Sequence, residues 1–383
     1  MKKNNFFRTA GFLALAILAG CATPSVPPTA TIDTPKETAP VIAPRRAIAL
    51  DQLPGWSSED PLAAVQGLKA ACPKLIKRGG DNNYFGNKYA DRIAPARWQE
   101  ICADARTVSN ESGAAYFWQQ NFEAIPMVDG DKNTGLITGY YEAELHGSLK
   151  KSEKFRYPLY KMPSDKYLDL SRREIDHGAL QGKKLELVWI DDPVSVFALH
   201  IQGSGRVTLD DGRVMRVGFA GKNRQPYYSI GKAIGEQNIL PKDKIEMASI
   251  EKWLRNNPER AATILQTNPS YIFFRQIDGL AEHHEGPIGA YGLPLIPERS
   301  IAVDRAFYPL GIPMWIDAAH PVNGAPLQKI VYAFDTGSAI KGKIRADYFF
   351  GSGDDAKYAA GQMRGRGKLY AIVPRGEIAV SSK

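Results

Sequence analysis

The sequence predicts an α+β protein that is mainly β-strand with helices. Helical periodicity dominates the chain up to about Phe122, and strand-like segments follow it. About 330 residues remain once the N-terminal leader and a proline-rich segment are set aside, which is enough chain for two domains. The net charge of +8 is modestly basic, which suits a partner that carries carboxylates or an anionic lipid surface.

The first residues, 1–20, have the pattern of a lipoprotein signal peptide. Basic residues precede an apolar run over 10–19, and the sequence LAGC at 18–21 matches a bacterial lipobox. The run is too short to span a bilayer comfortably. We therefore expect cleavage before Cys21 and lipid on its thiol; the alternative is an ordinary signal peptide or a buried helix. Ala22 after the cysteine favours the outer membrane of a Gram-negative cell, with the body of the chain on the periplasmic face.

Residues 21–48, which begin with the lipidated cysteine, are predicted to be a tether. They are rich in proline, threonine and alanine, and six prolines between 24 and 44 prevent regular structure. Such a segment lets a lipid-anchored body reach away from the membrane surface.

Cys72 and Cys102 remain after Cys21 is assigned to lipidation. An even pair in an oxidising compartment predicts a disulfide. Each cysteine lies in a predicted helix, over 61–76 and 95–105, so the bridge would join two neighbouring helices. A loop of about 30 residues makes such a bridge worth roughly 3–4 kcal/mol in the chain-entropy description. Two buried free thiols are the alternative.

The later elements are predicted from apolar alternation and from helix caps. The helix over 244–256 has Asp243 as its predicted cap, an apolar stripe at Met247, Ile250 and Leu254, and an end at Asn257-Pro258. Strands are predicted over 136–145, 185–190, 194–201, 213–219, 271–275, 330–334 and 369–373.

The segment FDTGSAIKGKIRAD at 334–347 is the most informative part of the chain. It places Asp335 and Asp347 at the two ends of a loop that follows an apolar strand. Its glycines let the backbone approach a ligand, and Lys341 supplies a cation beside the carboxylates. Asp304 lies upstream in the sequence VDR, before the turn PLGIP at 309–313.

Each aspartate has a structural alternative. Asp304 is as consistent with a turn cap or an ion pair with Arg305 as with substrate positioning. For Asp335 an orienting role in the loop is slightly favoured. Asp347 precedes three aromatic residues, and that apolar setting raises a carboxyl pKa by desolvation and keeps the group protonated near neutral pH. Asp347 is therefore the preferred general acid.

Other chemistries fit the sequence less well. Ser204 lies in QGSGR rather than in a nucleophile elbow. His283 and His284, with Glu282 and Glu285, lie in a polar segment where adjacent histidines point apart, so we predict no metal and no cofactor. Nucleic acid is an unsuitable partner, since no basic stretch is interleaved with aromatic residues in a stacking pattern.

A set of ordered blocks between about residue 56 and residue 374 resembles the MltA family of membrane-bound lytic murein transglycosylases, including its "3D" domain. The blocks are TGYYEAEL at 138–145, HIQGSGRV at 200–207, FAGKN at 219–223, YYSIGK at 227–232, NPSYIFFR at 268–275, the aspartate segment, and GSGDDA at 351–356. Ser338 replaces a glycine that is common in the family. The resemblance implies a double-psi β-barrel domain from 49–140 and 272–378, with a smaller β-barrel domain, 141–271, inserted into it and the substrate between them.

The resemblance further implies a peptidoglycan lytic exotransglycosylase, a carbon–oxygen lyase that uses one aspartate as general acid and then base. Its partners would be peptidoglycan glycan strands, outer-membrane lipid through Cys21, and cell-wall synthesis or division proteins. A murein-binding lipoprotein without turnover, a hydrolytic muramidase and a metal-dependent hydrolase stay open as alternatives. The expected substrate-binding residues are Thr138, Gly139, Tyr140, Tyr141, Gln202, Gly203, Ser204, Gly205, Lys222, Ser229 and Lys341.

Overall fold

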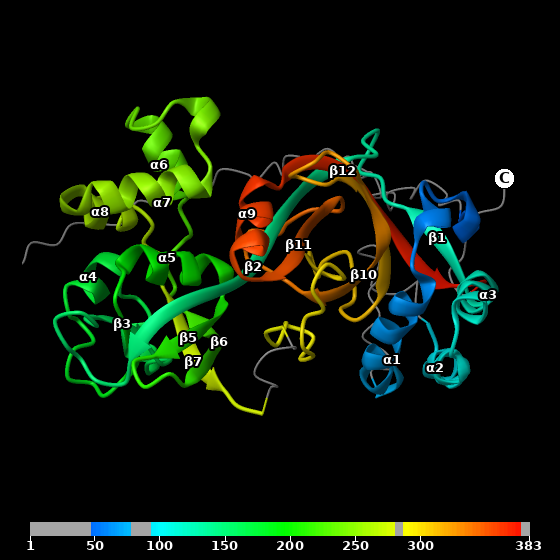
Figure 1. Cartoon of the computed structure of the whole chain (residues 1–383), viewed down its shortest axis with the longest axis horizontal. Coiled ribbons are helices and arrows are strands. Elements are labelled where there is room, and N and C mark those ends of the chain that lie inside the picture. Colours follow the sequence, from blue (N-terminus) through cyan, green and yellow to red (C-terminus); the bar gives the residue numbers. More distant parts are fainter. Residues whose placement is uncertain (1–46, 78–92, 280–285, 377–383) are drawn as a thin grey trace, which may run out of the picture. The chain divides into compact units, whose positions relative to one another are not determined.

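The computed structural model describes residues 47–77, 93–279 and 286–376, and in these ranges it has the predicted α+β character (Figure 1). The predictions for Cys21, for the tether up to residue 46 and for the histidines at 283 and 284 lie outside the described residues. None of the described helices is both long enough and apolar enough to cross a membrane. The helices are α1 (Pro61–Lys77), α2 (Pro95–Thr107), α3 (Glu111–Asn121), α4 (Arg172–Asp176), α5 (Pro193–Gln202), α6 (Ile230–Glu236), α7 (Met247–Asn256), α8 (Pro258–Leu265) and α9 (Asp354–Gln362).

Twelve strands form one connected sheet in the described part of the chain. They are β1 (Phe122–Pro126), β2 (Gly135–Ser148), β3 (Tyr157–Tyr160), β4 (Glu186–Ile190), β5 (Ser204–Leu209), β6 (Val214–Lys222), β7 (Ile272–Ile277), β8 (Ser300–Val303), β9 (Pro313–Ala319), β10 (Pro326–Asp335), β11 (Arg345–Ser352) and β12 (Arg364–Pro374). The predicted strands at 136–145, 185–190, 213–219, 271–275, 330–334 and 369–373 are confirmed, with shifted ends.

Six of these strands pair in a closed ring, in the order β12, β9, β10, β8, β11, β2 and back to β12. Two neighbouring pairs are parallel, β10 with β8 and β11 with β2, and the other pairs are antiparallel. Large side chains from this ring are fully buried, among them Trp315, Tyr332, Phe334 and Tyr348. The strands of the ring therefore contribute to the main hydrophobic core of the protein.

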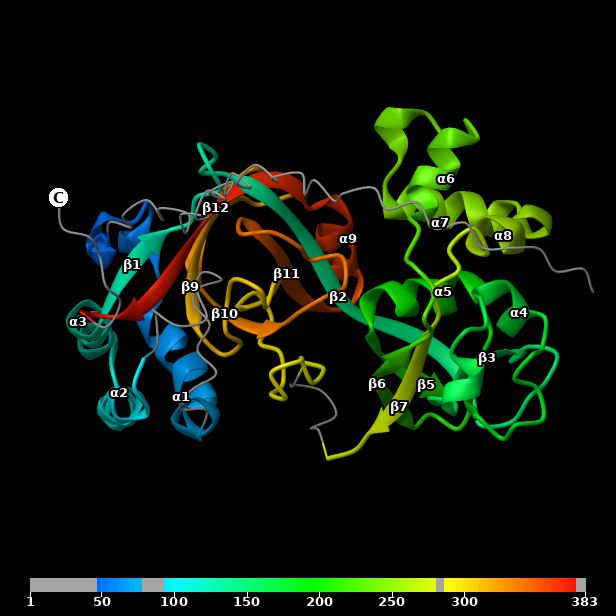
Figure 2. The ribbon, with the colours of Figure 1, turned by 180° about the vertical axis from the view of Figure 1, so that it is seen from behind.

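Strand β2 belongs to two groups of strands. Its first part pairs with β11 and β12, and residues 143–147 pair with β5, which continues through β6 to β7. Figure 2 shows this long strand leaving the ring and entering the second group. The segment between β2 and β7 has two hydrophobic clusters of its own, one beneath α5 to α8 and one around Leu180 and Phe273.

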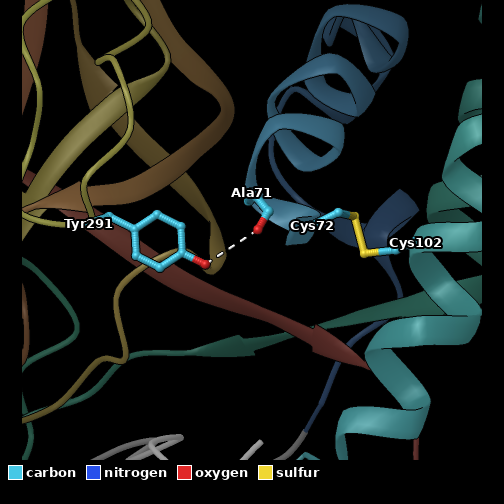
Figure 3. Close-up of a disulfide and its surroundings, with 4 residues drawn as sticks. All are labelled: Ala71, Cys72, Cys102 and Tyr291. Carbon is cyan, nitrogen blue, oxygen red and sulfur yellow. Dashed lines mark hydrogen bonds between the residues drawn. A yellow bond between two sulfur atoms is a disulfide. The ribbon is translucent and has the colours of Figure 1, made fainter. Parts of the chain in front are cut away.

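The N-terminal helices pack against one another beside the ring. Cys72 of α1 and Cys102 of α2 form a disulfide with their Cα atoms 5.8 Å apart. The hydroxyl of Tyr291 donates a hydrogen bond of 3.4 Å to the carbonyl of Ala71, next to the bridge (Figure 3). The helices predicted over 61–76 and 95–105 are confirmed as α1 and α2.

The strand predicted over 194–201 is wrong, because this segment is helix α5. The carboxylate of Asp192 accepts hydrogen bonds from the backbone N–H groups of Val194 and Ser195, at 3.0 and 3.2 Å, and Pro193 occupies the first turn. Gly203 ends the helix with a φ of 81°. A capped start and a glycine end outweigh the β-branched composition of the segment.

The helix predicted over 244–256 begins later, as α7 at Met247, with Glu246 and not Asp243 at its N-cap. Asp243 lies in a short 3₁₀ turn, Lys242–Lys244, so the predicted cap is wrong. The apolar stripe of the helix is buried at Ile250 and Leu254, and a second helix, α8, begins at Pro258.

Candidate active site

The candidate acids lie in one line of residues that are paired across neighbouring strands of the ring, which we call the aspartate row. Asp335 on β10 pairs with Ala302 on β8, which pairs with Asp347 on β11, which pairs with Thr138 on β2. Neighbouring strands lie about 4.8 Å apart, so two strand spacings separate the backbones of the two aspartates by about 10 Å. The fold thus brings together two carboxyl groups and a hydroxyl from three separate strands.

Asp335 is held by backbone and side-chain donors, among them the N–H group of Thr336. The N–H of Ala290 donates to its Oδ1 at 2.9 Å, and the Tyr140 hydroxyl donates to its Oδ2 at 3.1 Å. Burial raises the pKa of Asp335 to about 6, although these donors lower it, and the charge of Asp347 contributes to the rise. Asp335 is therefore a carboxyl whose protonation changes near neutral pH.

Asp347 accepts a hydrogen bond from the Thr138 hydroxyl. Burial raises the pKa of Asp347, and the Thr138 hydrogen bond and the charge of Arg345 oppose that rise. Nη2 of Arg345 in turn donates to the Thr138 hydroxyl at 2.9 Å. Arg345 and Thr138 therefore form a relay that orients the Asp347 carboxyl.

Tyr140 interacts with both carboxyls. Burial raises the pKa of its phenol strongly, and the charges of Asp335 and Asp347 raise it further. The phenol is therefore neutral and able to donate a hydrogen bond. Its ring lies 5.1 Å from that of Phe349, which provides an apolar wall beside the acids. A buried acid with a raised pKa and an oriented proton is suited to general acid catalysis.

Asp304 supports the loop between β10 and β11. Its carboxylate accepts from the N–H groups of Gly342 at 2.8 Å and Ala306 at 3.1 Å, and its side chain is 7% exposed. Lys341 brings its Nζ to 3.7 Å from the same carboxylate. Gly342 adopts a φ of 117°, which a residue with a side chain rarely tolerates. Asp304 thus has the contacts of a turn cap.

Several predicted binding residues make packing contacts. At Gly139 an added Cβ would lie 2.7 Å from Phe350 and 2.9 Å from the Cα of Ala360, so the missing side chain lets α9 approach β2. At Gly205 it would lie 2.7 Å from both the carbonyl of Ala143 and the side chain of Leu199. These two glycines are explained by close packing.

In the described part of the chain, no hydrogen bond or ion pair joins the other predicted binding residues to Asp335 or Asp347. The N–H of Tyr141 donates to Oε1 of Gln202 at 3.1 Å, and burial and the charge of Glu251 raise the pKa of the Tyr141 phenol. Gly203 ends α5, Ser204 begins β5, and Lys222 is exposed at the end of β6. The Ser229 hydroxyl caps α6.

The sequence reasoning assigned no role to Arg345. The signal was present, because Arg345 precedes Asp347 by two positions on one strand and such residues share a face.

Among the residues that the structure describes, no group of three or more His, Cys, Asp or Glu side chains is arranged to hold a metal ion.

Family comparisons agree with this geometry. The family described as "MltA specific insert domain" matches residues 136–275, and the "3D domain" family matches residues 299–373. Membrane-bound lytic murein transglycosylase A of Vibrio cholerae is 31% identical over 66% of this chain and 70% of its own.

Solved structures are similar over nearly the whole described chain. The lytic transglycosylase LtgG of Burkholderia pseudomallei is 39% identical with a TM-score of 0.60, covering 88% of this chain and 98% of that one. MltA from Neisseria gonorrhoeae is 32% identical with a TM-score of 0.73, and the match covers 87% of this chain and 93% of that one. The matched families, the relatives and the shared fold together show that this chain belongs to the MltA family of lytic murein transglycosylases.

Proposed function

We propose that the protein is a lytic transglycosylase that cleaves the β-1,4 bond between N-acetylmuramic acid and N-acetylglucosamine in peptidoglycan. The observation that carries the proposal is the aspartate row that joins Asp335, Asp347 and Thr138, with raised pKa values for both carboxyls. The names of the relatives in Vibrio cholerae, Burkholderia pseudomallei and Neisseria gonorrhoeae support the same class of reaction.

In the proposed mechanism Asp347 serves both half-reactions. Its protonated carboxyl donates to the departing glycosidic oxygen. The resulting carboxylate then takes the proton of the muramic C6 hydroxyl, which attacks C1 and closes the 1,6-anhydro ring. The substrate's 2-acetamido group stabilises the cationic centre, so no second carboxylate nucleophile is needed. Thr138, held by Arg345, orients the acid, and Asp335 with Tyr140 provides a second hydrogen-bonding position.

The finer architecture belongs to the same proposal. We infer that the six-stranded ring is the double-psi β-barrel, formed by 49–140 and 272–378, with 141–271 as the inserted domain. The two parallel pairs within the ring and the family match over 136–275 support this division. The binding roles of Gly139, Tyr141, Gln202, Gly203, Ser204, Gly205, Lys222, Ser229 and Lys341 are proposed with it.

We also infer that the protein is anchored by lipid on Cys21 to the periplasmic face of the outer membrane, where cell-wall synthesis or division proteins are candidate partners. The lipobox pattern and the word "membrane-bound" in the names of relatives support the anchor.

Mass analysis of the products released from purified sacculi tests the reaction. Anhydro ends lack one water relative to hydrolytic ends, so the wild-type protein should release fragments one water lighter than those made by a muramidase. Products of hydrolytic mass would establish the muramidase alternative instead. Binding to sacculi without any release would establish the non-catalytic alternative.

A further inference from the structure

A cavity of about 770 Å³ lies within the segment 141–271, apart from the aspartate row. Its walls come from β3, β4, α4, α5, α7 and α8 and from the residues beside them. It lies between the two hydrophobic clusters of this segment, since Phe197 and Leu254 line it from one and Ile175 and Tyr271 from the other. A cavity of this size is large enough for a small ligand.

The distinctive group in its wall is Arg172, whose side chain is only 3% exposed. Its Nε donates to the carbonyl of Asn268 at 3.1 Å, and its Nη2 donates to the carbonyl of Ser270 at 2.7 Å. The guanidinium also lies 4.7 Å from the ring centre of Phe197 and 5.1 Å from that of Tyr271. These contacts fix its position without neutralising its charge.

His200 does not neutralise it either. Nη2 of Arg172 lies 2.9 Å from Nδ1 of His200, and since a guanidinium can only donate, Nδ1 is the acceptor. Burial and the charge of Arg172 hold the pKa of His200 well below its usual value, which agrees with a neutral ring. Among the described residues no carboxylate forms an ion pair with Arg172, and its Nη1 has no hydrogen-bond partner. The charge of Asp176, four residues further along α4, acts on Arg172 without a direct ion pair. An anionic ligand in the cavity would provide the direct partner that a buried cation favours.

The remaining lining adds cationic and aromatic groups. Lys151 lies 5.1 Å from the ring centre of Trp189, and the guanidinium of Arg156 lies 5.2 Å from that of Tyr157. Neither cation forms an ion pair with a described residue. Arg255, by contrast, is already paired with Asp192 and Glu251. The free cations therefore offer positions for carboxylates beside flat apolar surfaces.

Two carboxylates of the lining complete the chemistry. Asp176 and Asp191 also line the cavity, so it can accept an ammonium group as well as carboxylates. A ligand that carries both groups on a short, partly apolar backbone is a peptide. Peptidoglycan carries short peptides with free carboxylates on its muramic acid residues.

We propose that this cavity binds the stem peptide of peptidoglycan, with one peptide carboxylate on Arg172. The choice of peptide rests on the proposed function, whereas the preference for a carboxylate rests on the cavity alone. Binding here would hold the substrate through its peptide while the glycan occupies the aspartate row.

Calorimetry with two matched probes tests the proposal. The probes are N-acetyl-Ala-γ-Glu-Lys and the same peptide with its carboxyl groups converted to amides, each titrated into the full mature chain in detergent. We expect the carboxylate peptide to bind about 10- to 100-fold more tightly, as charge-assisted hydrogen bonds require. Equal affinity for the two probes, or no binding of either, would overturn the proposal.

Variants locate the binding in the cavity. Arg172→Met should remove the preference between the two probes, and Arg172→Lys should restore part of it. Because Arg172 also holds backbone carbonyls, the exposed pair Lys151→Gln and Arg156→Gln provides a second test, in which affinity for the carboxylate peptide falls several-fold. The control is Arg213→Gln in the same segment, an exposed residue that pairs with Asp211 at 2.6 Å and does not line the cavity, which should bind like wild type. Wild-type affinity in both the Arg172→Met and the Lys151/Arg156 variants would place the peptide elsewhere.

The Asp347→Asn variant separates this proposal from the proposed function. It should bind the peptide as wild type does while releasing no anhydro products. If the wild-type protein releases anhydro products but does not bind the peptide, the cavity proposal alone is rejected. Peptide binding by a wild-type protein that releases nothing would reject the reaction alone. Binding of a muropeptide that is tighter than binding of the free peptide would identify the glycan-attached stem as the ligand.

Discussion

Asp347 and Asp335 have raised pKa values for the same main reason, burial, but their hydrogen-bond partners differ. Asp347 accepts from a hydroxyl that an arginine orients, whereas Asp335 accepts from a backbone N–H and a phenol. The backbone N–H at Asp335 is a fixed donor, whereas the Thr138 hydroxyl can rotate to follow the protonation state of Asp347. This difference agrees with the proposal that Asp347 transfers the proton and that Asp335 is a fixed support.

Asp347→Asn should abolish release of 1,6-anhydromuropeptides while leaving sacculus binding and thermal stability nearly unchanged. The amide keeps the size of the side chain and can still accept from Thr138, but it cannot transfer a proton. General acid–base catalysis is worth about 10²–10⁴-fold, and one group here serves both half-reactions. Product release measured by chromatography checks this. Asp335→Asn should lose less activity, and a dead Asp335→Asn beside an active Asp347→Asn would reverse the assignment.

Thr138→Val should move the alkaline limb of the activity profile to higher pH. The Thr138 hydrogen bond lowers the pKa of Asp347, so its removal lets the pKa rise further above the usual range. The acid then stays protonated to a higher pH, although the less well oriented carboxyl lowers the maximal rate. Thr138→Ser keeps the hydroxyl and is the control. An alkaline limb that moved to lower pH would show that Thr138 does not stabilise the carboxylate.

The raised pKa of Asp335, about 6, also predicts how stability depends on pH. A carboxyl whose pKa is higher in the folded than in the unfolded chain contributes stability that is full below the unfolded value and is lost as the pH rises to the folded value. The free energy of unfolding should therefore fall by roughly 1–3 kcal/mol between about pH 4 and pH 6. Asp335→Asn should flatten that fall in urea titrations. If the free energy of unfolding of the variant falls with pH as steeply as that of the wild type, other titrating groups cause the fall.

Among the elements, β2 links the chemistry to the packing of the chain. Its residues alternate in role, since Thr138 and Tyr140 contact the aspartates while Gly139 faces α9. This alternation follows from the two-residue period of a strand. The helix α9 therefore packs directly behind the strand that orients the acid.

Gly139→Ala should destabilise the protein by about 1–3 kcal/mol, as overpacking typically does. The added methyl would lie 2.9 Å from the backbone of Ala360, which cannot turn aside as a side chain could. Gly365→Ala, on the neighbouring strand β12, is the matched control, because an added Cβ there meets nothing within 4 Å. Chemical denaturation of the two variants compares them, and equal stabilities would show that α9 shifts without cost.

The success of sequence-based prediction differed between elements for a physical reason. The helices α1 and α2 have long apolar periodicity and were predicted closely. In α5 the β-branched residues favoured a strand, while the cap at Asp192 and the proline after it favoured a helix, and the capped start prevailed. Helix-cap signals occupy only a few residues, so a prediction based on the periodicity of a whole segment gives them too little weight.

At the scale of the whole molecule, the candidate acids were predictable but their arrangement was not. The aspartates stand out because of their glycine-rich loop and their apolar neighbours. Their alignment depends on β8, which lies between β10 and β11 and places Ala302 opposite both acids. No local pattern specifies that β8, a strand from earlier in the chain, lies between β10 and β11, which a short loop connects. The contribution of Arg345 was not predictable either, because it acts through Thr138 on β2, and the pairing of β11 with β2 is not visible in the local sequence.

The activity of the whole molecule also depends on how it reaches its substrate. The proposed catalytic residues lie between Thr138 and Asp347, whereas the predicted attachment is a single thiol, Cys21, followed by a proline-rich tether. A single lipidated cysteine at the new N-terminus confers stable attachment only through its acyl chains. Loss of that thiol should therefore change the location of the protein without changing its chemistry.

Cys21→Ser should yield a periplasmic or unprocessed protein that no longer fractionates with the outer membrane. The purified variant should release anhydro products from isolated sacculi at the wild-type rate, because the substitution lies far in sequence from the aspartate row. Membrane fractionation with an outer-membrane marker measures the first effect, and the product assay measures the second. A processed variant that stayed with the membrane would reveal a second anchor, and a variant that lost activity on isolated sacculi would show that Cys21 has a role beyond attachment.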